Sequence, residues 1–141
     1  MIIAALALVG VFVALYLTLY KVGVIGHLAC GMGGCERVNT SRWAIFVGAP
    51  VAAWGLVFYI ATLVVALVGT SPSMLNRREV SYLLATMSLV GVAFSAWLTY
   101  LELYVIDAVC RYCVASAVIV TLIFIVSIAD LMLGRKELQL V

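Results

Sequence analysis

The stretch "DAVCRYCVASAVIVTLIFIV", residues 107–126, places two cysteines directly before a long run of apolar residues. The run continues to Leu133, and Asp130 is its one charged residue. An apolar segment of about 20 residues is long enough to cross the hydrocarbon core of a bilayer as an α-helix. The stretch therefore predicts a membrane-spanning helix that begins beside a Cys-x-x-Cys pair, Cys110 and Cys113.

Three further apolar runs precede this one. Of the 141 residues, 67% are hydrophobic and 10% are charged, and the mean hydropathy is +1.30. A soluble domain of this size could not bury so much apolar side chain. The runs lack an alternation of period two and are too long for barrel strands, so they predict helices. We expect an all-α membrane protein, a single domain over residues 1–141 that forms a four-helix transmembrane bundle, with helices at about 2–20, 50–69, 80–101 and 113–133.

The connections between the runs differ in length. Residues 21–49 form the one sizeable polar segment, and they hold the other two cysteines of the chain. Within this loop Trp43–Val47 is apolar but too short to span, which predicts a short interfacial or re-entrant segment before the second helix. The connection 102–109 is so short that the last two helices should be antiparallel neighbours.

Charge and cysteine positions together predict an orientation. Basic residues are equal in number on the two sides, but those of the middle connection and the C-terminal tail are packed into less sequence, which favours the cytoplasm for them. All the cysteines fall on the opposite side. An even number of thiols on one side indicates pairing in an oxidising compartment. We therefore expect loops one and three, with the cysteines, on the extracytoplasmic side of the membrane or in an equivalent lumen.

Three interpretations of the thiols compete. They are structural disulfides, a four-cysteine zinc site, and thiol–disulfide exchange. The gap from Cys30 to Cys35 makes a poor half of a zinc site, so we predict no metal. Exchange is favoured, because a Cys-x-x-Cys disulfide exchanges easily and a helix N-terminus stabilises a thiolate. The glycines of "CGMGGC" (30–35) would also let those two cysteines swing.

Several segments resemble one known family. With the four spans, "CERVNTSRW" (35–43), "PVAAWGLVFY" (50–59) and "CRYCVAS" (110–116) resemble the vitamin K epoxide reductase family, and more closely its prokaryotic branch. The resemblance implies a membrane thiol oxidoreductase that couples disulfide formation in a thioredoxin-like partner to reduction of a membrane quinone. Some prokaryotic relatives carry a thioredoxin-like domain after the last helix. None follows here, so we expect a separate partner protein and a prokaryotic cytoplasmic membrane.

The resemblance also implies residue roles. Cys110 and Cys113 match the family's active-site pair, and Cys30 and Cys35 match the loop pair that carries electrons from the partner. Ser41 matches a serine close to the active-site cysteines, and Trp43 matches an aromatic at the edge of the quinone pocket.

Two positions depart from the animal enzymes. Where those enzymes have an asparagine and a tyrosine that touch the quinone head, this chain has Val51 and Ala117. We therefore expect an ordinary respiratory quinone, of the menaquinone or ubiquinone type, rather than vitamin K epoxide. Cys113, one helical turn deeper than Cys110, should face the quinone, and a dithiol–disulfide couple matches its two electrons and two protons without a metal.

Other interpretations stay open. Glu102 and Asp107 flank the third connection and either relay protons near the cysteines or mark the water interface; we favour the second. A different class of function is a non-catalytic four-span scaffold whose outer disulfides brace a partner-binding surface, although its loops are small for a recognition domain. No basic run with interleaved aromatics suggests nucleic acid, and we expect a monomer in contact with membrane lipid.

Overall fold

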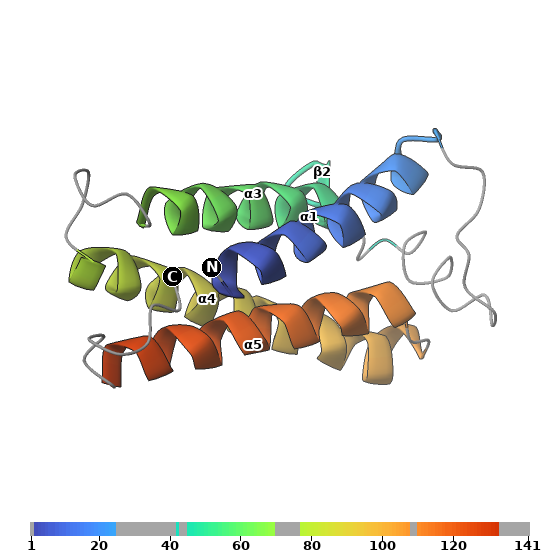
Figure 1. The fold of residues 1–141 in the computed structure, drawn as a ribbon. Helices are drawn as coiled ribbons and strands as arrows, with labels where there is room; N and C mark the ends of the chain where they lie inside the picture. The colour runs from blue at the N-terminus through green and yellow to red at the C-terminus, as the bar shows by residue number, and fades with distance from the viewer. Residues whose placement is uncertain (1, 25–41, 43–44, 70–76, 108–109, 133–141) are drawn as a thin grey trace.

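The computed structural model describes residues 2–24, 42, 45–69, 77–107 and 110–132. Long helices dominate it, and successive helices run in opposite directions (Figure 1). Four helical segments are long and apolar enough to cross a membrane, which confirms the all-α transmembrane fold. The helices are α1 (Ile2–Lys21), α3 (Val51–Gly69), α4 (Arg77–Tyr100) and α5 (Arg111–Met132).

The third span is longer than the sequence predicted. At Leu101, where we expected it to end, α4 continues into a π-helical turn, η2 (Leu101–Ile106). The helix stops at Asp107, whose φ of 58° lies in the left-handed region and whose N–H bonds the carbonyl of Glu102. Glu102 therefore belongs to the membrane helix rather than to a connection. π-helical turns are rare, and they often occur at functional sites.

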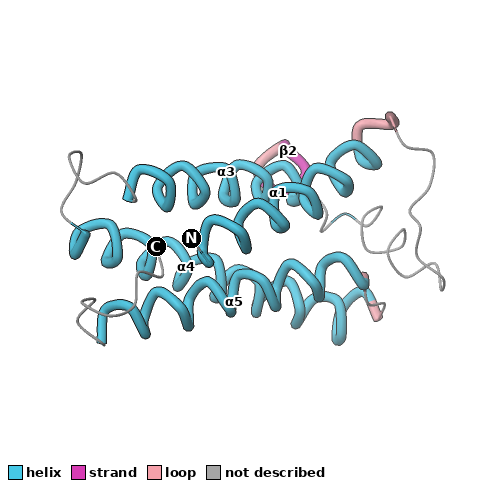
Figure 2. The backbone as a smooth tube through the Cα atoms, in the orientation of Figure 1, coloured by secondary structure: helices cyan, strands magenta, loops and turns pink. Residues whose placement is uncertain are grey.

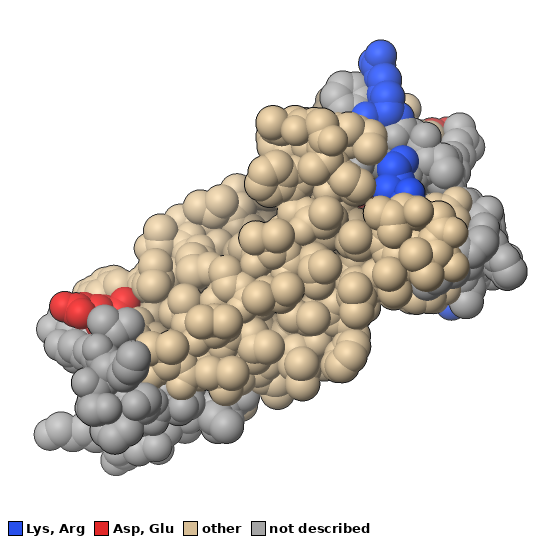
Figure 3. Space-filling view, turned by 90° about the horizontal axis from the view of Figure 1, so that it is seen from above, with Lys and Arg blue, Asp and Glu red and all other residues tan. Residues whose placement is uncertain are grey.

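The outer surface fits a bilayer. In Figure 3 the middle of the visible face carries no coloured charge, and the Lys, Arg, Asp and Glu atoms lie at its two ends. Large apolar side chains point outward from the helices: Phe12 is 63% exposed, Val90 65% and Ile125 55%. Such exposure would be costly in water but is ordinary against lipid tails.

A short hairpin precedes α3, where we expected an interfacial segment. Its strands are β1 (Ile45–Phe46) and β2 (Ala49–Pro50), and Ile45 pairs with Pro50 (Figure 2). The two turn residues, Val47 and Gly48, have φ values of 52° and 79°, as a two-residue hairpin turn with positive φ requires. Pro50 directly precedes the helix, a place where its missing N–H removes no helical hydrogen bond.

Small residues set the distance between α1 and its neighbours. The buried side of α1 carries Ala4, Ala7, Gly10 and Ala14. At Gly10 the ring of Tyr59 from α3 packs so closely that an added Cβ would overlap it. Small residues at helix contacts are a common way to bring membrane helices together, because association there depends on close packing.

The packed core and the open part of the bundle lie in different halves. The buried cluster around Ile3, Ala66, Leu84 and Ile123 occupies the half away from Cys110. The opposite end of the bundle, which carries Cys110, is formed by four helix ends: the end of α1, the start of α3, the end of η2 and the start of α5 (Figure 1). The described ends on either side of residues 25–41 also lie there, so the long connection leaves and re-enters at the end that carries Cys110.

The contact at Gly10 gives a prediction for stability. Gly10→Ala should lower the free energy of unfolding by about 1–3 kcal/mol, because the methyl group forces Tyr59 and α3 apart. Thermal unfolding in detergent micelles measures this change. Gly55→Ala in α3 is the matched control, since no heavy atom lies within 4 Å of its added Cβ. If the two variants melt together, the packing at Gly10 does not limit the helix distance.

Candidate functional site

The site begins at the N-terminus of α5. The carbonyl of Cys110 accepts the first helical hydrogen bond, from the N–H of Val114 at 3.0 Å, so Cys110 is the N-cap residue. An N-cap side chain faces the backbone N–H groups of the first turn. Here the N–H groups of Tyr112 and Cys113 hydrogen-bond to the sulfur of Cys110. The spacing of the pair thus places one sulfur as the helix cap and the other one turn into the helix.

Hydrogen bonds make Cys110 the more acidic thiol expected of an exchange site. The pKa of Cys110 is lowered to about 7, chiefly by a hydrogen bond from the Cys113 side chain. Burial opposes this shift, the two backbone N–H groups add to it, and the charge of Glu102 opposes it. Cys110 is fully buried, while Cys113 keeps part of its surface accessible. Near neutral pH a substantial fraction of Cys110 is therefore thiolate, the reactive form of cysteine.

Glu102 is a third member of the site. Its Oε2 accepts a hydrogen bond from the N–H of Cys110 at 3.3 Å, and its carboxylate also hydrogen-bonds to the side chain of Cys113. The side chain is only 5% exposed. The interpretation of Glu102 as a marker of the water interface is therefore wrong. The charged residue that appeared to end the helix is turned inward against both cysteines.

The sequence held a signal for this residue. Ser81, Ser88, Ser95 and Glu102 follow one another at intervals of seven. Residues seven apart lie on nearly the same side of an α-helix, so these polar side chains share one face. Ser81 and Ser88 are each 1% exposed, which shows that this face points into the bundle. A search for polar residues at heptad spacing would have placed Glu102 inside rather than at the boundary.

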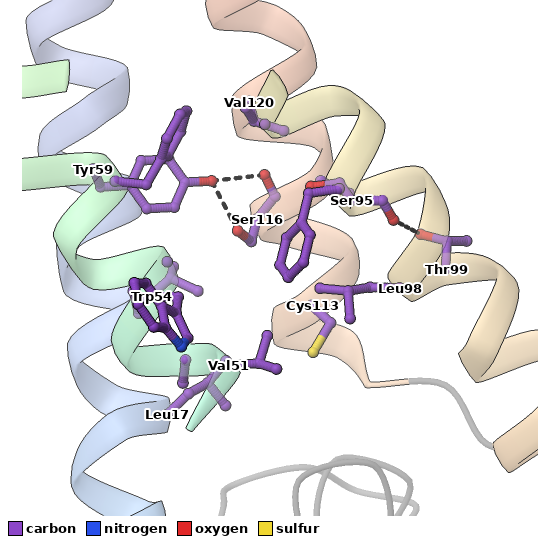
Figure 4. Close-up of a pocket in the computed structure, with 18 of the residues that line it drawn as sticks. Leu17, Val51, Trp54, Tyr59, Ser95, Leu98, Thr99, Cys113, Ser116 and Val120 are labelled. Atoms are coloured by element: carbon purple, nitrogen blue, oxygen red, sulfur yellow. Dashed lines mark hydrogen bonds between the residues drawn. The ribbon is translucent and has the colours of Figure 1, made fainter. Parts of the chain in front are cut away.

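A cavity opens beside Cys113 (Figure 4). Its volume is about 220 Å³, and residues of α1, α3, α4, η2 and α5 line it. Most of the wall is apolar. Its polar groups include the Cys113 sulfur, the Glu102 carboxylate and the pair formed by Tyr59 and Ser116. The Tyr59 hydroxyl donates to the Ser116 carbonyl at 2.8 Å and lies 2.8 Å from the Ser116 hydroxyl.

The hairpin is fastened to one wall of this cavity. The indole N–H of Trp54 donates to the carbonyl of Phe46 at 2.9 Å. The Phe46 ring packs edge-on against Trp54 and Phe94, with centroid distances of 6.4 and 5.8 Å. Both partners line the cavity, one from α3 and one from α4. Phe46 therefore connects the two helices across the outside of the cavity wall.

The structure describes four of the residues predicted for the site. Cys113, Val51 and Ala117 all line the cavity, and Cys110 lies at the start of the same helix. Cys30, Cys35, Ser41 and Trp43 lie outside the described residues. Within the described ranges no three His, Cys, Asp or Glu side chains form a group that could hold a metal ion.

A comparison with protein families identifies the chain. The family model described as the vitamin K epoxide reductase family matches residues 1–128, a range that contains the first three spans, the Cys-x-x-Cys pair and most of α5. The chain therefore belongs to this family. Its members are membrane oxidoreductases that use quinone-type substrates.

The hydrogen bonds at Cys110 predict an ionisation near neutral pH. In a variant with Cys30 and Cys35 replaced by serine, the first thiolate absorbance should appear at a pKa of about 7, well below the ordinary cysteine value of about 8.5. Cys113→Ala in the same background removes the largest stabilising bond, so the pKa of Cys110 should rise. Ultraviolet difference titration measures both values. A first ionisation at the ordinary cysteine value would show that the thiolate is not stabilised here.

Proposed function

We propose that this member of the family oxidises the thiols of a thioredoxin-like partner protein and passes the electrons to a membrane quinone. The observation that carries the proposal is the position of the Cys-x-x-Cys pair. One sulfur caps a membrane helix and ionises easily, and the other faces an apolar cavity between the helices. A dithiol in this position can exchange with a protein disulfide at the membrane surface and with an oxidant dissolved in the lipid.

The cavity suits a quinone ring. Ligand sites for apolar molecules are mostly hydrophobic, with a few polar groups that fix orientation. The wall beside Cys113 has this composition, and its hydroxyl pair at Tyr59 and Ser116 could hydrogen-bond a ring oxygen. Val51 and Ala117 offer aliphatic surface rather than polar side chains. This supports a respiratory quinone of the menaquinone or ubiquinone type over an epoxide.

The proposed electron path has three exchanges. Partner thiols first reduce the loop disulfide Cys30–Cys35. The Cys35 thiolate then attacks Cys110 of the Cys110–Cys113 disulfide, forming a Cys35–Cys110 bond and releasing Cys113 as a thiolate. Cys30 next attacks Cys35, which restores the loop disulfide and leaves Cys110 and Cys113 reduced. Re-forming their disulfide releases two electrons and two protons, which convert a quinone to its quinol.

Two further residues are assigned by the family resemblance. Ser41 is proposed to hydrogen-bond a cysteine sulfur of the active-site pair, and Trp43 to border the quinone pocket. We also propose that the cysteine end faces the outside of a prokaryotic cytoplasmic membrane, and that the protein acts as a monomer. The oxidoreductase chemistry of the family argues against the non-catalytic scaffold that the sequence left open.

The first test is direct. Purified protein given dithiothreitol should reduce a short-chain quinone, and Cys113→Ala should abolish the reaction because the dithiol can no longer form a disulfide. Thr121→Val is the control, since Thr121 lies on the exposed side of the same helix and its hydroxyl hydrogen-bonds the Ala117 carbonyl. The change in quinone absorbance gives the rate. Turnover in Cys113→Ala at the wild-type rate would refute the assignment.

The second test separates the loop pair from the active pair. Cys30→Ser should block oxidation of a reduced thioredoxin-like protein, because the loop pair can no longer relay its electrons. The same variant should still turn over with dithiothreitol, a small reductant that can reach the active pair directly. Both rates are followed through quinone absorbance. A variant equally inactive with both donors would show that the loop pair is not a relay.

A further inference from the structure

We propose that Glu102 is a catalytic residue, which accepts the proton of the Cys113 thiol and delivers it within the cavity to the quinone that the dithiol reduces. The inference rests on the proposed function and extends it from electrons to protons. It gives a chemical role to the acidic side chain that, among the residues the structure describes, contacts both cysteines.

The geometry connects the carboxylate to the reacting sulfur. The side chain of Cys113 is within hydrogen-bonding reach of both the Cys110 sulfur and the Glu102 carboxylate, so rotation of the S–H bond turns its single proton from the sulfur to the carboxylate without any movement of the backbone. The backbone N–H of Cys110 holds Oε2 in place at 3.3 Å. Glu102 and Cys113 also line the same cavity. One carboxylate thus contacts the thiol on one side and borders the proposed substrate space on the other.

Such a group fits the proton balance of the reaction. When the sulfurs of Cys110 and Cys113 join, the pair gives two electrons to the quinone, which also takes up two protons. Glu102 carries the proton of Cys113, while the proton of Cys110, whose pKa is about 7, is exchanged with water and the quinone takes its second proton from water. Glu102 is 5% exposed and its carboxylate contacts the Cys113 side chain, so it is a closer acceptor for the proton of Cys113 than bulk water. A carboxylate that takes this proton and then gives it to a quinone oxygen is deprotonated again at the end of the turnover. Positioned acid–base groups of this kind contribute roughly 10²–10⁴-fold to a rate.

A purely structural role makes a different prediction. If Glu102 only anchored the start of α5, glutamine would serve as well, because its amide oxygen can accept the N–H of Cys110. The two roles also differ at Cys110, since the charge of Glu102 raises the pKa of that thiol. Removing the charge should therefore lower the pKa of Cys110 further. The variant would hold a more acidic thiol and yet react more slowly.

The experiment compares Glu102→Gln with wild type. With dithiothreitol and a short-chain quinone, the rate should fall on the order of 100-fold. In the background lacking Cys30 and Cys35, thiolate absorbance should show the pKa of Cys110 below the wild-type value. Glu79→Gln is the matched control, because Glu79 is an exposed acid at the other end of the same span, and it should leave the rate and the pKa unchanged.

The possible outcomes separate the inference from the function. A Glu102→Gln rate within about threefold of wild type, far from the roughly 10²-fold expected of proton transfer, overturns the role of Glu102 and leaves the proposed function standing. A wild-type protein that does not reduce quinone overturns both. If Glu102→Gln does not fold, Glu102→Asp decides, because a carboxyl withdrawn by one methylene should slow the reaction at least about tenfold. A wild-type rate in Glu102→Asp would then reject the assignment.

Discussion

The N–H groups at the start of α5, which need acceptors from outside the helix, are the constraint on which the site depends. A helix leaves its first N–H groups without partners, and near a bilayer little water is available to satisfy them. In this protein the sulfur of Cys110 accepts from Tyr112 and Cys113, and the carboxylate of Glu102 accepts from Cys110. The groups that complete the helix end are therefore the same groups that the proposed chemistry uses. The same hydrogen bonds stabilise the end of the helix and the thiolate of Cys110.

Tyr59 stands at the border between two parts of the bundle. On one side its ring packs on Gly10 within the closely packed half, and on the other its hydroxyl reaches Ser116 at the cavity wall. The half around Ile3 and Ile123 holds the helices together through apolar contact. The half around Cys113 keeps space between them. The Tyr59 side chain thus contacts α1 in the packed half and α5 at the cavity wall.

The sequence predicted the spans well and the polar interior less well. Unbroken apolar runs specify membrane helices because the bilayer permits few alternatives, and the spacing of Cys110 and Cys113 placed both sulfurs in one turn. Glu102 was misplaced because a single charged residue ordinarily marks the end of a span, and its hydrogen bonds to Cys110 and Cys113 depend on tertiary contacts. The Val47–Gly48 turn was missed because valine rarely adopts positive φ. Cys30, Cys35, Ser41 and Trp43 lie outside the described residues, and their roles stay predictions.

The π-helical turn η2 changes the direction in which side chains point within one continuous helix. A wider turn accommodates an additional residue without interrupting the helix, and every side chain after it is rotated relative to the face set by Ser81 and Ser88. Residues 103–106 therefore point in other directions than the serines do. Glu102, at the start of the turn, still points inward as the serines do. Leu103, Tyr104 and Val105 accordingly point outward, while Ser81, Ser88 and Glu102 point into the bundle.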